Sequence, residues 1–270
     1  MSLTIRTEEF TPPGPRDFNL PPIGTDKTFE WLGATHYLGV TKPMLQLVLA
    51  AVLVFVLFWA ASRRRAMVPG RLQFVGEEAY GFVRNSMSRE IIGGDHWQRY
   101  VPYLFALFFF ILVNNVFATI PFLQFPTFSR SGMVYGLAAM SWVVYNAAGI
   151  HKHGFLGYLK LQCVPAGIHG PILALLIPLE FMSNLIVRPV TLALRLFANM
   201  LAGHLLLILF ALGGEFLLLH MAIQYAPVGI LAWVLFILIA FLELLVQFLQ
   251  AYVFVLLNAM YISGAVADEH

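Results

Sequence analysis

The stretch RPVTLALRLFANMLAGHLLLILF, residues 188–210, places one arginine, Arg195, in the middle of a long apolar run. An arginine side chain is not deprotonated in a protein, so it remains positively charged. At the centre of a membrane helix that charge costs roughly 2.5–3.5 kcal/mol or more on insertion scales. A cation in this position predicts a functional role, in contact with a protein partner or a water-filled cavity.

The composition is typical of a polytopic membrane protein. Of 270 residues, 60% are hydrophobic and 11% are charged, and the mean hydropathy is +0.79. The net charge of +2 is too small to indicate nucleic-acid binding. The single cysteine, Cys163, excludes an intramolecular disulfide and a Cys-rich metal site. We therefore expect no metal, no cofactor and no nucleic-acid partner.

Apolar runs of about 20 residues, enough to cross a bilayer, define the expected spans. Three lie at about 44–61, 101–121 and 132–150, and two longer runs lie at about 171–212 and 228–262. As helices the longer runs would measure roughly 60 and 50 Å, against a hydrocarbon core of ~30 Å. Each is therefore either two short crossings or one steeply tilted helix. Gly213, Gly214 and Pro227 would join the two runs as a helical hairpin.

The expected fold class is an all-α polytopic membrane protein. It comprises three transmembrane helices, an amphipathic surface helix and the long, steeply tilted two-helix hairpin. The tail, residues 1–43, precedes a single membrane domain, residues 44–270. The amphipathic helix is predicted from apolar residues at helical spacing, namely Leu72, Val75, Ala79, Phe82, Val83 and Met87.

Charge asymmetry predicts the orientation. The segment from Arg63 to Tyr100 carries seven arginines and four acids, whereas the N-terminal tail carries four basic and five acidic residues. By the positive-inside rule the arginine-rich segment is cytoplasmic and the N-terminus is outside. A cytoplasmic loop is expected after Ile150. Five crossings then leave the C-terminus, with Asp268 and Glu269, in the cytoplasm.

The polar residues of the last two runs are predicted to form stripes, because residues 3, 4, 7 or 11 apart share a helix face. Counted from Arg195, one stripe contains Glu180, Asn184, Arg188, Thr191 and Asn199, and another contains Glu243, Gln247 and Gln250. His204 points to the opposite flank and would form a proton-relay pair with Glu243. Asn115 could add a polar group on that side. Purely structural roles are the alternative to a functional one. Asn114, Gln247 and Asn258 could simply form hydrogen bonds between helices, and Arg188 could form an ion pair or extend its charged end to the membrane surface.

These residues resemble the ATP synthase subunit a family. RPVTLALRLFANMLAGH and ELLVQFLQAYVFVLLNAMYI, residues 188–204 and 243–262, are similar to its two signature helices. RRRAMVPGRLQ and NNVFATIPF, residues 63–73 and 114–122, also look like the family, so the resemblance covers most of residues 40–263. One departure is Ala118, where other bacterial members carry an acid.

The resemblance implies a proton-conducting stator subunit in the bacterial cell membrane. Arg195 would face a rotor ring of small hairpin subunits, each with one membrane carboxylate. The resemblance implies that the outer half-channel would contain Asn115, Asn199, His204, Glu243 and Gln250, and the inner half-channel Glu180, Asn184 and Thr191. Peripheral-stalk subunits and membrane lipid would be direct partners, and the catalytic head an indirect one.

Two other classes remain open from the residues alone. A proton-coupled secondary transporter would also bury charges near the midplane, but it usually has broken helices and internal pseudo-symmetry, and neither is evident. A haem-bearing subunit would need paired buried histidines, and only His204 lies deep in an apolar run. The chain has no G-x-x-x-x-G-K-[ST] loop, so we do not expect it to act as an enzyme by itself.

Overall fold

The computed structural model describes residues 12–14, 28–31, 34–37, 40–63, 70–94, 97–120, 126–164 and 172–267. Arg64, Arg65, Pro121, Asp268 and Glu269, which entered the predictions above, lie outside these ranges, as does most of the N-terminal tail. Within the tail, β1 (Thr28–Trp31) and β2 (Ala34–Tyr37) pair antiparallel. The remaining regular structure is helical, which confirms the all-α class for the membrane domain.

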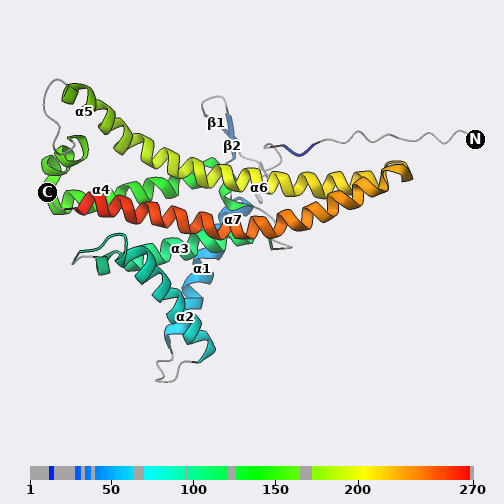
Figure 1. Ribbon diagram of the computed structural model, residues 1–270, viewed down its shortest axis with the longest axis horizontal. Coiled ribbons are helices and arrows are strands. Elements are labelled where there is room, and N and C mark those ends of the chain that lie inside the picture. Colours follow the sequence, from blue (N-terminus) through cyan, green and yellow to red (C-terminus); the bar gives the residue numbers. More distant parts are fainter. Residues whose placement is uncertain are drawn as a thin grey trace, which may run out of the picture.

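Seven α-helices and several short π and 3-10 segments make up the domain (Figure 1). Four helical stretches are long and apolar enough to cross a membrane, namely 42–63, 131–163, 175–219 and 223–266, and 101–117 is a shorter apolar helix. The elements in order are α1 (Lys42–Arg63), α2 (Arg71–Phe82), η2 (Val83–Arg89), η3 (Trp97–Arg99), α3 (Val101–Phe117), η4 (Thr127–Ser129), α4 (Ser131–Cys163), α5 (Ile172–Met182), η5 (Ser183–Val187), α6 (Arg188–Leu219), η6 (Ile223–Tyr225) and α7 (Ala226–Val266).

The α6–α7 pair confirms the helical hairpin but corrects its turn. The two helices lie side by side along the long axis of the molecule (Figure 1), and the turn is at residues 220–222. Gly213 and Gly214 lie inside α6 and do not break it. A Cβ at Gly214 would be 2.5 Å from Trp233 Cδ1 and 3.3 Å from the carbonyl oxygen of Gly229. Gly214 is therefore needed for a close helix–helix approach.

Helix α4 is longer than the expected span at 132–150. It continues to Cys163, and His151, Lys152, His153 and Lys160 are helical, so the prediction of a loop there was wrong. The direction changes at Gly154, which has φ 72° and ψ 167°. Positive φ is readily adopted only by glycine. The last part of the helix therefore turns back, and a Cβ at Gly149 would overlap the ring of Tyr158.

The core lies where α3, α4, α6 and α7 meet. Helix α3 ends at Phe117, earlier than the expected boundary at residue 121. The turn after it is stabilised by a hydrogen bond from the backbone N–H of Ala118 to Asn115 O, at 3.0 Å. The fully buried apolar side chains of the core include Leu104, Phe108, Ile111, Leu196, Phe254 and Ile262.

Helices α1 and α2 project from the rest of the bundle (Figure 1). The expected amphipathic helix is present as α2 and η2, but its apolar residues do not share one environment. Leu72 and Val75 are more than half exposed, whereas Val83 and Met87 are completely buried. Because η2 is a π-helix, its register is shifted relative to α2, and the later residues turn toward the core.

Candidate functional site

Arg195 lies on the exposed face of α6. Thr191 and Leu194 are exposed beside it, while Leu192 and Leu196 on the opposite face are buried. No acidic side chain of the described ranges forms an ion pair with the Arg195 guanidinium. The chain therefore presents an uncompensated cation on a mainly apolar helix face. Such a face requires a partner or water, because an isolated charge is costly in hydrocarbon.

The predicted polar stripe around Arg195 is interrupted. Asn184 is only 8% exposed and faces the interior, whereas Arg195 and Thr191 face outward. The reason is η5, the π-helical segment Ser183–Val187, which contains Asn184 and immediately precedes α6. A π turn inserts an extra residue, which rotates the chain before it by about 100° relative to an uninterrupted α-helix. Counting in steps of 100° across this segment therefore placed Asn184 on the wrong face.

Asn184 is part of a buried hydrogen-bonded network with α4, which we call the Asn184 cluster. Asn184 Nδ2 donates to Gln162 O at 2.7 Å and to Glu180 Oε2 at 3.3 Å. Gln162 Nε2 donates to Tyr158 Oη at 3.0 Å, and Tyr158 Oη donates to Asn146 Oδ1 at 2.9 Å. Polar groups thus form a continuous chain from α4 to the start of the α6 stretch.

Sequence reasoning missed Asn146, Tyr158 and Gln162. Tyr158 and Gln162 are one helical turn apart, but they meet Asn146 only because α4 turns back at Gly154, and no periodicity of one straight helix predicts that contact. The available signal was Gly154 itself, within the polar segment HKHG, since a glycine inside a helical pattern can mark a change of backbone direction.

Arg188 contacts an aromatic ring. Its Cζ lies 5.3 Å from the centroid of Tyr261 on α7. This distance is typical of a cation–π interaction. The Glu180 side chain accepts a hydrogen bond from Asn184, and no ion pair between Glu180 and Arg188 is present among the described residues. Of the two structural alternatives for Arg188, an ion pair or extension of its charged end to the membrane surface, the ion pair is therefore not formed with Glu180.

A second network joins α3 to α7, and we call it the Glu243 cluster. Gln247 Nε2 donates to Glu243 Oε1 at 3.2 Å, and Thr119 Oγ1 donates to Gln247 Oε1 at 3.0 Å. Asn115 Nδ2 donates to the Gln247 carbonyl oxygen at 3.0 Å. Gln247 therefore does link two helices, as one alternative predicted, whereas Asn114 and Asn258 donate to carbonyl groups of their own helices.

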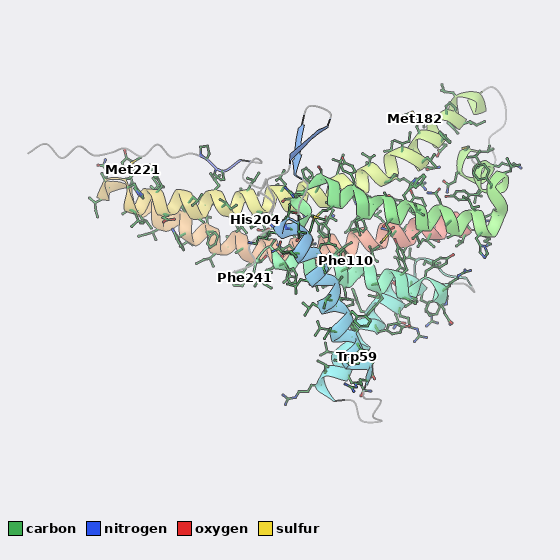
Figure 2. All side chains as sticks on the ribbon, turned by 180° about the vertical axis from the view of Figure 1, so that it is seen from behind. Trp59, Phe110, Met182, His204, Met221 and Phe241 are labelled. Atoms are coloured by element: carbon green, nitrogen blue, oxygen red, sulfur yellow. The ribbon has the colours of Figure 1, made fainter. Side chains whose placement is uncertain are left out.

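Helix α6 meets this cluster at Gly203. A Cβ at Gly203 would be 3.3 Å from both Cδ and Oε1 of Glu243. The next residue, His204, is 7% exposed and lies between the labelled residues Met182 and Met221 in Figure 2. Glu243 is 6% exposed, and its Oε2 makes no hydrogen bond within the described part of the chain. The predicted stripe of Glu243, Gln247 and Gln250 is buried throughout.

The two clusters lie on opposite sides of Arg195 along α6. Gly203, at the Glu243 cluster, is eight residues from Arg195, or about 12 Å at a rise of 1.5 Å per residue. Asn184 is eleven residues away in the other direction, or about 16 Å. The antiparallel register places Gln250 at about the level of Arg195. Gln250 is 8% exposed and Asn199 is half-buried.

Between the clusters the helix interface is closely packed and apolar. On α6 and α7 the side chains there are at most 1% exposed, namely Leu192, Leu196, Met200, Ala251, Phe254 and Val255. No set of three or more His, Cys, Asp or Glu side chains of the described residues could hold a metal ion. The arrangement therefore consists of two separated polar clusters, a mainly apolar interface between them in which Gln250 is a buried polar residue, and the exposed cation Arg195.

Comparisons with known proteins agree with this architecture. A family model described as ATP synthase A chain matches residues 44–263. A protein named ATP synthase subunit a from Nocardioides sp. is 75% identical over 270 residues, covering 98% of each chain. Its counterpart from Pseudarthrobacter chlorophenolicus is 48% identical over 263 residues, covering 97% of this chain and 96% of the relative. That from Streptomyces lividans is 40% identical over 261 residues, covering 97% and 89%.

Proposed function

This chain belongs to the ATP synthase subunit a family, and we propose that it is the stator subunit whose two half-channels and fixed arginine couple proton flow to rotation. Membership makes it a multi-pass membrane subunit of an F-type ATP synthase. The proposed direct partners are a rotor ring of small subunits with membrane carboxylates and the peripheral stalk. The catalytic head would be an indirect partner, and this subunit would carry no ATP chemistry of its own.

The observation that carries the proposal is the position of Arg195 between the two polar clusters. A proton can be exchanged among the polar groups of either cluster. Gln250 extends the Glu243 side to about the level of Arg195, but the buried apolar side chains of Leu192 and Phe254 lie between it and the Asn184 cluster. A proton that crosses the membrane must therefore leave one cluster, travel on another molecule and return at the other cluster. The exposed face that carries Arg195 is where that molecule would pass.

The electrostatics of Arg195 explain how the carrier would be discharged. A rotor carboxylate must be protonated in lipid, because an uncompensated charge there is costly. At about 4 Å from the guanidinium, with an effective dielectric near 20, the attraction between the two charges is about 4 kcal/mol. That attraction favours the ionised carboxylate, so the proton leaves near Arg195. The fixed cation also repels protons and prevents direct leakage between the half-channels.

We assign the clusters to the two half-channels from the predicted topology. With the N-terminus outside, α1 runs inward and α3 runs outward, so Asn115 and Thr119 lie toward the outer surface. The outer half-channel would then contain the Glu243 cluster with His204, Asn199 and Gln250. The inner one would contain the Asn184 cluster, including Glu180, with Thr191 at its exposed edge.

Replacement of Arg195 by lysine tests the proposal. A desolvated lysine can lose its charge, and its ammonium lacks the planar guanidinium fork. We expect Arg195→Lys to abolish ATP-driven acidification of inverted membrane vesicles while the assembled complex still hydrolyses ATP. Arg71→Lys, at an exposed position of α2, is the matched control. Near-normal pumping by Arg195→Lys would contradict the role of a fixed charge.

A further inference from the structure

A groove outside the proton pathway lies between the projecting helix α1 and the bundle. It has a volume of about 960 Å³ and is lined by α1, α3, α4 and η4. Helix α1 packs on α3 and on η4, but it does not pack closely on α4, so the space between α1 and α4 stays open. Trp59, which lines the groove, lies on the projecting part of α1, and Phe110, also in the wall, lies where α1 crosses the bundle (Figure 2).

The wall of the groove is almost entirely apolar. Its two hydroxyl groups already have partners inside the protein, since Ser62 Oγ donates to Trp59 O at 3.0 Å and Tyr103 Oη donates to Ser141 Oγ at 3.1 Å. Gly136 on α4 leaves part of the wall open, because a Cβ there would meet nothing within 4 Å. The groove therefore suits a flexible hydrocarbon chain and offers no site for a polar ligand along its length.

One end of the groove continues into a smaller hollow that is lined in part by polar and charged side chains, and we call it the polar hollow. This hollow has a volume of about 470 Å³ and shares Phe58, Ser62 and Phe105 with the groove. It lies between the end of α1 and the helix α2. The two helices approach closely there, because a Cβ at Gly76 would be 2.9 Å from Ala61 Cβ. An apolar compartment and a polar compartment are thus joined end to end.

The polar hollow contains charges of both signs. Arg84 and Glu77 line it, and Gln73 Nε2 donates to Glu77 Oε1 at 2.7 Å, which helps to orient the carboxylate. A second cation, Arg63, lies at the same end of α1 with its Cζ 4.9 Å from the Trp59 ring. Guanidinium groups bind phosphate through charge-assisted hydrogen bonds. A carboxylate close by is complementary to an ammonium group.

We propose that the groove and the hollow together bind a phospholipid with a zwitterionic ethanolamine headgroup. One or both acyl chains occupy the groove, the phosphate binds Arg84, and the ammonium group donates to Glu77. Membrane lipid tails are as apolar as the groove, so burial of the tail alone gives little selectivity. Selection therefore depends on the headgroup contacts in the polar hollow.

The proposal can be tested with photoreactive lipids. The purified complex is reconstituted in phosphatidylcholine nanodiscs with a trace of lipid that carries an acyl-chain diazirine and either an ethanolamine or a choline headgroup. We expect the ethanolamine lipid to label peptides from residues 47–62 and 133–140 about tenfold more than the choline lipid, which corresponds to about 1.4 kcal/mol. Choline differs because its methylated nitrogen cannot donate a hydrogen bond to Glu77.

Three variants test the contributions of the groove and of the polar hollow separately. Gly136→Leu fills the groove without a predicted clash and should abolish labelling by both lipids, whereas Gly132→Leu, an equally open position of the same helix outside the groove, should leave it unchanged. Arg84→Gln should reduce labelling by the ethanolamine lipid to the level of the choline lipid. It alters no residue of the apolar groove, so it decides the headgroup question even if Gly136→Leu impairs assembly.

Two results would overturn the proposal. Equal labelling by both headgroups in the unmodified complex would identify the bound lipid as ordinary surrounding bilayer. Absence of lipid labelling, combined with capture of a neighbouring protein helix by a photoreactive amino acid at position 136, would show that a protein partner fills the groove.

Discussion

The backbone of Gly203 on α6 lies against the carboxyl group of Glu243 on α7, where a Cβ would be 3.3 Å from Glu243 Cδ. This contact brings α6 to the Glu243 cluster and is tight, so a larger side chain at residue 203 would require the Glu243 carboxyl group to move. Arg195 lies eight residues away along the same helix, or about 12 Å. The position of the carboxyl group is therefore sensitive to the size of residue 203.

Gly203→Val is expected to slow proton transfer without preventing assembly. The branched side chain would push the Glu243 carboxyl group out of its place, and misplacing a reacting group by about 1 Å can cost on the order of a hundredfold in rate. We expect ATP-driven vesicle acidification to fall by about tenfold or more. Gly213→Val, where a Cβ would meet nothing within 4 Å, is the matched control. Equal pumping by the two variants would contradict the prediction.

Gln247→Leu is expected to weaken the link between α3 and α7. It removes the side-chain hydrogen bonds to Glu243 and Thr119, which leaves buried polar atoms unpaired at a cost of about 1–3 kcal/mol. The loss should appear as a lower temperature of thermal inactivation of the purified complex. A double-mutant cycle with Thr119→Val should give a coupling of about 0.5–1.5 kcal/mol. Strict additivity of the two changes would argue against the hydrogen bond.

Gly214→Val is expected to destabilise the hairpin near its turn. The new side chain would collide with Trp233 and the Gly229 backbone, and such overpacking typically costs about 1–3 kcal/mol. The amount of assembled complex and its thermal stability should both decrease. Combination with Trp233→Ala removes the nearest obstacle and should partly restore stability. If Gly214→Val were neutral, the helices could not approach as closely as they do here.

Gly149→Ala is expected to disrupt the Asn184 cluster. Its methyl group would overlap the Tyr158 ring, so the turned-back part of α4 would have to move away from Asn146. Gln162, which donates a hydrogen bond to Tyr158, would move with it. We expect slower proton pumping with little change in ATP hydrolysis. Gly157→Ala serves as the control, because a Cβ there makes only an ordinary contact at 3.5 Å. Unchanged pumping by Gly149→Ala would show that the turned-back segment is not part of the proton pathway.

Several features could be predicted from local pattern alone. The apolar runs gave the membrane class and the approximate spans, since about 20 apolar residues are needed to cross a bilayer. Arg195 stood out because its charge cannot be removed. The boundaries were less accurate: α4 extends to Cys163 and α6 to Leu219, because the polar residues and glycines near those ends continue a helix once neighbouring helices pack against them.

The sequence by itself determined which polar groups need a hydrogen-bond or charge partner. They are a permanent cation, a carboxylate and several side-chain amides in a chain that is otherwise apolar enough for lipid. Only the tertiary structure decided which of them meet. The π-helical segment at Ser183–Val187 turned Asn184 inward and left Arg195 outward, and the positive φ of Gly154 brought Tyr158 back onto Asn146. Both depend on departures from regular α-helix, and periodicity arguments assume that such departures are absent.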